Sequence, residues 1–351
     1  MALFIHGIGS ISPAPAFAAR PAAAAVARPG NRLHALEPHY ADYLDARVSR
    51  RMSRIVKMGT VTALQALRDA GLPTTDGVIA GTGWGCLEDT VTFLQKMVTN
   101  QEEMLSPTSF IHSTHNTIAS QVAYQLKCRG YNNTYVHRNI SFESALLDAT
   151  LLLLENPAAN LLVGGIDELT DTSFDILTRL KTFKEPTASV PEADDDTRAD
   201  KLYGAGTPGT WAGEGSTFFA VSGQLQPDSY AQLLAVRTVS FSTPTEAAAI
   251  ARTLLAAHGY AQVDLLLSGD NGDLANDDAC HHFLAELGHQ GPVEKFKHLC
   301  GEYPTASAFA LGLAATQIAG RTPESPTPPR SILIYNRFQQ AHQSLLLLAA
   351  C

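Results

Sequence analysis

The chain has 351 residues, of which 45% are hydrophobic and 17% are charged, and its net charge is −9. This length and apolar content suffice for a large core in one or two domains. The negative charge argues against nucleic-acid binding. Five cysteines without a CxxC pair favour a reducing compartment over a disulfide framework or a zinc site, so we expect no metal and no cofactor.

The N-terminal residues predict a strand rather than a targeting segment. Met1–Gly7 lacks the basic region of a signal peptide. The longest apolar run, around Leu151–Leu154, stops at Glu155 and is too short to span a membrane. We therefore expect a cytoplasmic protein with no membrane span.

Short, nearly all-apolar runs along the chain predict strands that are buried on both faces. They lie at Leu3–Gly9, Gly77–Gly83, Asn160–Gly165, Val263–Gly269 and Ser331–Tyr335. Helical patterns lie between them, at Met52–Ala70, at Phe142–Glu155, and at Ala247–His258 after a capping box of Thr243 and Glu246 with Pro244. The alternation predicts an α/β protein with covered sheets.

The chain divides into two halves by composition. Residues 1–180 and 215–351 each contain strand and helix patterns and each ends near a hydrophobic strand. The connector at residues 181–214 is rich in Pro, Asp, Glu and Thr and contains the acidic cluster Asp194–Asp196. Such a composition is typical of a surface loop.

Seven blocks, in order along nearly the whole chain, resemble the β-ketoacyl synthase family. They are Ile5–Pro13, Arg50–Ser53, Gly77–Gly85, Pro107–Ala119, Gly164–Glu168, Gly213–Gly215 and Ser344–Leu347. Each block alone is unspecific, and the resemblance rests on their order and spacing. It implies a thiolase-like, five-layered αβαβα fold made of two similar halves.

The resemblance also implies where the reacting groups would stand. Condensation in this family needs a cysteine thiolate at a helix N-terminus and two histidines that stabilise the enolate and the oxyanion. Spacing from Gly164-Gly165 places the cysteine position at Asn139 or Ile140. By the same resemblance, Asn271 stands at the first histidine position, after the strand at Leu265–Gly269, and Glu302 stands at the second, in the loop that begins near Lys297. An ionised glutamate would repel an enolate. All three catalytic residue types are therefore replaced.

Other positions of the family's site are partly kept. Lys297 retains the lysine of the loop before the second histidine position, and we expect it to form an ion pair with Glu302. Phe338 retains the phenylalanine of the loop over the substrate tunnel, while Gln339 and Gln340 replace its glycines. Because glutamine lacks the freedom of glycine, the loop is expected to be stiffer. Asp273 replaces a threonine that commonly helps to hold the pantetheine arm.

Ser141 is a weak candidate for a substitute nucleophile. An alkoxide needs a paired general base, and the sequence reveals none. The favoured alternative is that Ser141 caps the helix Phe142–Glu155. Cys300 lies close to Glu302 in the chain, but we expect a buried, inert thiol there.

The leading functional hypothesis is a ketosynthase-like partner without condensing activity. It looks like the chain-length-factor subunits of type II polyketide and aryl polyene (flexirubin-like) systems, which pair with an active ketosynthase. Residues 107–125 and the helix Ser141–Glu155 are expected at the heterodimer interface. Docking of acyl carrier protein on this acidic chain would need a local basic patch, which Arg47, Arg50, Arg51, Arg54 and Lys57 could supply; the alternative is that these residues form a solvated helix face.

Two alternatives remain open. One is an active 3-oxoacyl-[acyl-carrier-protein] synthase or acyltransferase that uses Ser141 with Glu302 or retains only decarboxylation. The other is a homodimer that sequesters acyl chains or acyl carrier protein without catalysis. A co-purifying ketosynthase chain, an acyl adduct on Ser141, or neither of these with a stable self-dimer would distinguish the three.

Overall fold

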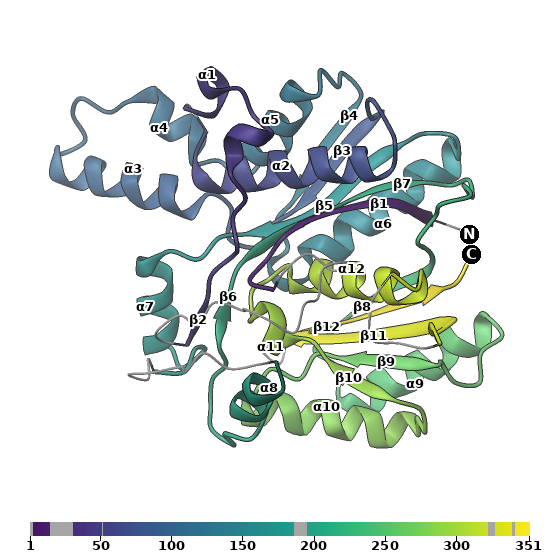
Figure 1. Cartoon of the computed structure of the whole chain (residues 1–351). Helices are drawn as coiled ribbons and strands as arrows, with labels where there is room; N and C mark the ends of the chain where they lie inside the picture. Colours follow the sequence, from purple (N-terminus) through teal and green to yellow (C-terminus); the bar gives the residue numbers. More distant parts are fainter. Residues whose placement is uncertain (1–2, 15–30, 51, 186–194, 322–326, 339–340) are drawn as a thin grey trace.

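Ten strands form the framework of the part of the chain that the computed structural model describes, which comprises residues 3–14, 31–50, 52–185, 195–321, 327–338 and 341–351 (Figure 1). The strands are hydrogen-bonded in the order β10-β9-β11-β12-β8-β1-β7-β5-β3-β4. The first group comprises β1 (Leu3–Ile11), β3 (Gly77–Gly81), β4 (Tyr131–Tyr135), β5 (Leu161–Asp167) and β7 (Gly215–Ser222). The second comprises β8 (Ala231–Ser240), β9 (Leu265–Ser268), β10 (Val293–Lys295), β11 (Ser331–Phe338) and β12 (His342–Ala349).

The two groups repeat one topology. When the strands of each group are numbered along the chain, both groups run 1-5-4-2-3 outward from the centre of the series. In both groups the fifth strand is antiparallel to its two neighbours, and the second, third and fourth strands are parallel. Short antiparallel pairing of Leu3–Ile5 with Ala231–Leu233 joins the groups. The protein thus consists of two similar halves, as the resemblance implies.

The position of β7 bears on the division of the chain. This strand pairs with β1 and β5 and so completes the first group, although the sequence division starts the second half at residue 215. The division into 1–180, 181–214 and 215–351 stays a prediction, and the strand order favours a boundary between β7 and β8. A small parallel pair, β2 (Arg32–Leu33) with β6 (Ala212–Gly213), lies in the segment before β7.

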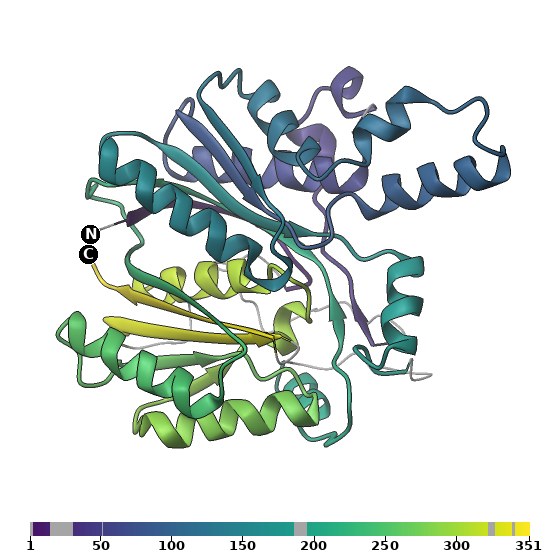
Figure 2. The ribbon, with the colours of Figure 1, turned by 180° about the vertical axis from the view of Figure 1, so that it is seen from behind.

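Helices complete a five-layered arrangement (Figures 1 and 2). Helices α2 (Arg54–Asp69) and α5 (Thr117–Gln125) cover the outer face of the first group of strands. Helices α9 (Pro244–Ala257) and α10 (Leu274–Leu287) cover the outer face of the second group, and α6 (Ser141–Glu155) and α12 (Ala306–Ile318) lie between the groups. Every residue of α12 is buried, as a helix that is apolar all round requires.

Shorter helices lie outside these five layers. Helices α3 (Leu87–Thr99) and α4 (Pro107–His112) pack on each other and project from the body of the protein (Figure 1). The others are α1 (Ala46–Ser49), α7 (Asp171–Arg179), α8 (Asp195–Tyr203), α11 (Lys297–Cys300) and the 3₁₀ turns η1 (Tyr40–Asp42) and η2 (Arg138–Ile140). Among the described residues, no helix has both the length and the apolar character needed to cross a bilayer.

Two glycines allow α2 to lie directly on β1. A Cβ atom on Gly7 would stand 2.2 Å from the carbonyl oxygen of Ala66, and one on Gly9 would stand 2.0 Å from that of Thr62. Any side chain at these positions would push the helix off the strand. The glycines of the first block of the resemblance are therefore packing residues.

The five strands that the apolar runs predict are present as β1, β3, β5, β9 and β11, but these runs do not include β4, β7, β8, β10 or β12. The predicted capping box is formed: the Thr243 hydroxyl accepts from the Glu246 backbone, and the Glu246 carboxylate accepts from the Thr243 backbone. Strand β4 has the sequence Tyr-Asn-Asn-Thr-Tyr and lies at the end of the strand series, where none of its residues is buried. An edge strand does not need the apolar run that reveals a buried one.

Candidate functional site

The loop before α12 is held against the Gly213-Glu214-Gly215 segment by two glycines. Gly301 has a φ of 71°, which favours glycine, and a Cβ on Gly213 would stand 2.1 Å from the Cys300 carbonyl oxygen. The close approach lets the backbone of Glu302 donate to Trp211 O at 2.9 Å and accept from Gly213 N at 3.0 Å. Glu302 is thereby fixed in the interior between the halves.

The Glu302 carboxylate is fully engaged by two side chains. Lys297 Nζ lies 2.5 Å from Oε1, and both side chains are completely buried. Asn271 Nδ2 donates to Oε2 at 2.8 Å. The expected Lys297–Glu302 ion pair is therefore confirmed. Burial raises the pKa of Glu302, while Lys297 and Asn271 act in the opposite direction.

Asn271 lies beyond the end of β9, and its position is fixed on both sides. Its backbone N–H donates to the Asp277 carboxylate at 2.8 Å, and its Oδ1 accepts from the Asp273 backbone at 3.1 Å. Asp273 itself caps α10 and accepts from Gly209 N at 2.5 Å. Asp273 thus fixes the loop between β9 and α10, and it also lines a cavity beside Asn271. The structure brings Asn271 together with Lys297 and Glu302, which lie 26 and 31 residues further along the chain.

The turn before α6 contains Asn139 and Ile140, the two residues expected at the cysteine position of the family. Arg138 has a φ of 53°, and Asn139 next to it is buried. Asn139 Nδ2 lies 3.4 Å from the carbonyl oxygen of Phe338, so the turn touches the end of β11. The neighbouring Ile140 is half-buried and begins the helix as its N-cap. Phe338 is thus adjacent to Asn139, while Gln339 and Gln340 lie outside the described residues.

The turns before α6 and α12 meet at Gly83. A Cβ on this glycine would stand 2.3 Å from Pro304 and 3.0 Å from the Arg138 carbonyl oxygen. Pro304 follows Glu302 by two residues, and Arg138 precedes Asn139. The N-terminal ends of the two central helices therefore converge, one from each half of the protein.

Ser141 is neither a helix cap nor an available hydroxyl. Its side chain is buried, donates to Arg138 O at 2.6 Å and accepts from His137 N at 2.9 Å. The predicted capping role is wrong, because α6 starts at Ser141 itself and Ile140 occupies the N-cap without a side-chain bond. The hydroxyl instead closes the 3₁₀ turn that precedes the helix.

Asp167 connects the halves and was missed by the sequence analysis as a site residue. Its Oδ1 accepts from Thr82 and from the backbone of Gly83 and Trp84 at 2.8–2.9 Å. Its Oδ2 accepts from the backbone and hydroxyl of Thr305 at 3.0 and 2.9 Å. Burial raises the pKa of Asp167 to about 6 against these hydrogen bonds. The sequence feature that could have identified this residue is a carboxylate shortly after Gly164-Gly165, at the end of β5.

Glu214 is a second buried carboxylate with a structural role. Arg54 donates to both of its oxygens at 2.6 Å, and the backbone of Ala35 and Leu169 donates at 3.0 and 2.9 Å. Burial raises the pKa of Glu214, but His34 and Arg54 outweigh it and lower the pKa to about 2. Arg54 is therefore not part of a free basic patch as expected, and Arg51 lies outside the described residues.

The thiols near the site are not nucleophiles in this structure. Cys86, Cys280 and Cys300 are buried, and burial raises the pKa of each thiol above its ordinary value. A raised pKa keeps the thiol protonated and unreactive. Cys300 is thus the buried framework residue that the sequence predicts.

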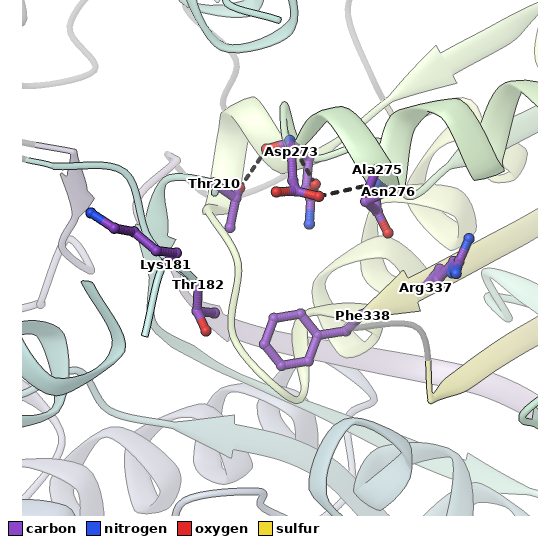
Figure 3. A pocket seen from close by; sticks show the side chains of 9 residues that line it. Lys181, Thr182, Thr210, Asp273, Ala275, Asn276, Arg337 and Phe338 are labelled. Atoms are coloured by element: carbon purple, nitrogen blue, oxygen red, sulfur yellow. Dashed lines mark hydrogen bonds between the residues drawn. The ribbon is translucent and has the colours of Figure 1, made fainter. Parts of the chain in front are cut away.

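A cavity opens beside Asn271. The space inside it amounts to about 550 Å³, counting the part that opens to solvent. Figure 3 shows its lining, in which Lys181 and Thr182 stand on one side and the first turn of α10 with Arg337 on the other. The full lining is Lys181, Thr182, Thr210, Asn271, Asp273, Ala275, Asn276, Arg337 and Phe338. The cavity therefore reaches both Asn271, which the sequence analysis expects at the first histidine position, and the end of β11.

Comparison with known proteins agrees with this arrangement. Residues 26–191, just under half of the chain, match the sequence model described as "Beta-ketoacyl synthase, N-terminal domain". No curated protein sequence is significantly similar to the chain. The resemblance recognised in the sequence is thus confirmed by the family model over the first half.

Solved structures extend the likeness to the whole chain. The ishigamide ketosynthase/chain length factor superposes with a TM-score of 0.78 at 17% identity, over 100% of this chain and 99% of that chain. A β-ketoacyl synthase from Burkholderia phymatum STM815 gives 0.74 at 15%, over 100% and 99%. The ketosynthase ApeO in complex with its chain length factor ApeC, from Xenorhabdus doucetiae, gives 0.73 at 17%, over 100% and 98%. The fold of this chain is the ketosynthase fold.

Proposed function

We propose that this ketosynthase-like chain is a non-condensing, chain-length-factor-type partner of an active ketosynthase in polyketide, aryl polyene or fatty-acid-like biosynthesis. The carrying observation is the state of Glu302. Its carboxylate binds Lys297 and Asn271 in the interior, where a condensing enzyme of this fold would present a histidine. An ionised Glu302 that is bonded to Lys297 and Asn271 cannot donate a hydrogen bond to an oxyanion and does not stabilise an enolate.

The assignment of Asn139 to the nucleophile position supports the same conclusion. The side chain at this position is an amide that is buried and contacts Phe338 O, and an amide is not a nucleophile for thioesters. The turns that would carry the reacting groups nevertheless keep their convergence at Gly83. We infer that the framework of the site is present without the side chains that condensation needs.

The surface of α6 supports a protein partner. Leu147, Leu151 and Leu154 are exposed along one side of this helix, while Phe142, Leu146 and Leu153 face the core. Helix α6 contacts the edge strand β4, where Tyr131 is also exposed. An apolar helix face beside an unpaired strand edge is typical of an interface. The partner we propose is the ketosynthase subunit, with acyl carrier protein as the shared substrate carrier.

The alternative of an active acyltransferase that uses Ser141 with Glu302 has less support. The Ser141 hydroxyl is bonded to the backbone of Arg138 and His137, and the Glu302 carboxylate is bonded to Lys297 and Asn271. A general base must reach the proton that it abstracts. Both groups would have to leave these bonds before they could act together.

A condensation assay with malonyl-loaded acyl carrier protein tests the proposal. The chain alone is expected to make no product, and a mixture with its ketosynthase partner is expected to change the length of the product. Product from the chain alone would contradict the proposal. Mass spectrometry of the chain after incubation with acyl carrier protein, with Ser141→Ala as the control, would then identify an acyl-serine intermediate. No effect in the mixture would favour the sequestering homodimer.

A further inference from the structure

Asn271 is followed by Gly272, and no other asparagine in the sequence precedes a glycine. An asparagine in this context is prone to deamidation, because glycine places no side chain beside the backbone nitrogen that attacks the amide carbon. The fold requires glycine at position 272, since its φ is 78° and a Cβ would stand 2.4 Å from the Leu202 carbonyl oxygen. The loop between β9 and α10 therefore contains a reactive pair of residues, in contact with Glu302.

Both reacting groups are held by hydrogen bonds in the folded loop. The Asn271 amide donates from Nδ2 to Glu302 at 2.8 Å and accepts at Oδ1 from Asp273 N at 3.1 Å. The Gly272 N–H donates to the two carboxylate oxygens of Asp277 at 3.2 and 3.1 Å. Attack requires the amide carbon to turn toward this nitrogen and the nitrogen to lose its proton. These hydrogen bonds therefore oppose the reaction while the loop is closed.

The backbone of Asn271 is fixed as well, although water can reach the loop. Its N–H donates to Asp277 at 2.8 Å, and its carbonyl oxygen accepts from the Thr210 hydroxyl. The residue is only 3% exposed, but it lines the cavity of about 550 Å³, part of which opens to solvent. Opening of the loop, rather than access of water, is thus the step that would limit deamidation.

We propose that Asn271 is a conformationally gated deamidation site, which is stable while the loop between β9 and α10 is closed and reacts when this loop opens. In the open loop Gly272 N attacks Asn271 Cγ, the bond from Cγ to Nδ2 breaks, and ammonia leaves with the proton that the attacking nitrogen loses. Water then cleaves the resulting succinimide. Cleavage at Cγ gives aspartate, and cleavage at the backbone carbonyl carbon gives isoaspartate.

The product would not fit the closed loop. An aspartate at position 271 would bring a second carboxylate to the contact where Nδ2 now donates to Glu302 at 2.8 Å. Two like charges at such a distance in a buried site are strongly unfavourable, and isoaspartate also lengthens the backbone of the loop. Deamidation would therefore change the wall of the cavity permanently, whether or not the chain is a ketosynthase partner.

Peptide mapping by mass spectrometry after incubation at mildly alkaline pH tests the proposal. The folded chain is compared with the chain unfolded in urea. We expect Asn271 to deamidate at least about tenfold more slowly in the folded chain, because opening of a packed loop costs free energy. Asn100, exposed at the end of α3, is the control and should differ less between the two conditions. Equal rates at Asn271, or no deamidation of the unfolded chain, would overturn the proposal.

Matched variants assign the protection to the hydrogen bonds of the loop. Asp277→Asn weakens the acceptor of the Gly272 N–H, so it should speed deamidation of the folded chain at least about threefold and leave the rate in urea unchanged. Asp278→Asn makes the same substitution at the next residue of α10, which is exposed, and should change neither rate. A folded Asp277→Asn variant with full protection would contradict this role of Asp277. The rates of the unmodified chain decide the matter if that variant does not fold.

The effect of the product is measured separately with Asn271→Asp. Its Tm should lie roughly 2 °C or more below that of the unmodified chain, because the new carboxylate faces Glu302. Asn100→Asp makes the same change at an exposed position and should leave Tm unchanged. An unchanged Tm in Asn271→Asp would show that the closed loop accepts the product, against the proposal.

Discussion

Buried charges at the site act in pairs, and this determines what single substitutions do. Lys297 and Glu302 are both inaccessible to solvent, so each is the compensating charge of the other. Removing one member leaves an uncompensated charge in the interior, whereas removing both replaces the pair by neutral groups. The pair therefore fixes the conformation of the loop before α12, and its net contribution to the free energy of unfolding is small.

We expect Lys297→Met to lower the free energy of unfolding by about 3 to 5 kcal/mol, because Glu302 loses its counter-charge. The double variant Lys297→Met/Glu302→Gln should recover most of this loss. Urea unfolding monitored by circular dichroism measures both. Lys181→Met is the matched control: its ion pair with Glu185 is exposed, so its loss should cost less than about 1 kcal/mol. Equal losses in the two lysine variants would contradict the role assigned to Lys297.

At the scale of elements, the two central helices have different surroundings although they occupy equivalent places in the two halves. Helix α12 is buried along its whole length, whereas α6 exposes one apolar side. Within a single chain no described element covers that side, and the fold provides no internal reason for leucines there. The asymmetry is the structural basis for assigning a partner to the first half.

We expect Leu151→Glu to weaken association with the partner at least tenfold while leaving the fold intact. Leu151 is 61% exposed at the middle of the apolar side of α6, so a charge there would be desolvated by the interface but not by the isolated chain. Co-purification and analytical ultracentrifugation measure association. Leu225→Glu, at a residue that is 57% exposed between β7 and β8, is the control. Unchanged association in Leu151→Glu would exclude α6 from the interface.

At the scale of the whole molecule, carboxylates tie together segments that are distant in the chain. Glu214 joins the segment before β7 to α2, to Ala35 and to the residues after β5, and Asp167 joins the glycine turn after β3 to the start of α12. These bonds cross from one layer to the next. Because their acceptors are carboxylates that titrate, the free energy of unfolding of the whole protein should depend on pH.

Glu214 should make the protein more stable at neutral than at acid pH. Its pKa is lowered from 4.5 to about 2 in the folded state, which corresponds to about 3 kcal/mol. Because the folded pKa is depressed, this contribution is complete above pH 4.5 and is lost as the pH falls toward 2. The stability difference between the unmodified chain and Glu214→Gln should thus be about 1 kcal/mol smaller at pH 3.5 than at pH 7. Urea unfolding at both pH values measures it, and a constant difference would contradict the lowered pKa.

The sequence by itself determined the local structure and the identity of the fold. Glycine and apolar runs predicted the buried strands, the Thr243–Glu246 capping box predicted the start of a helix, and ordered motifs indicated a ketosynthase-like chain. The Lys297–Glu302 pair could be predicted because both residues lie in one short loop. These features depend on near neighbours, whose spacing in the chain fixes their geometry.

Only the tertiary structure decided the features that depend on distant residues. Arg54 reads as a surface cation in the sequence, and its partner Glu214 is 160 residues away. The bond between Asn271 and Glu302 and the convergence of the two central helices at Gly83 likewise require distant segments of the chain to meet. Periodicity and spacing do not encode such contacts, because packing of the two halves alone sets which side chains become neighbours.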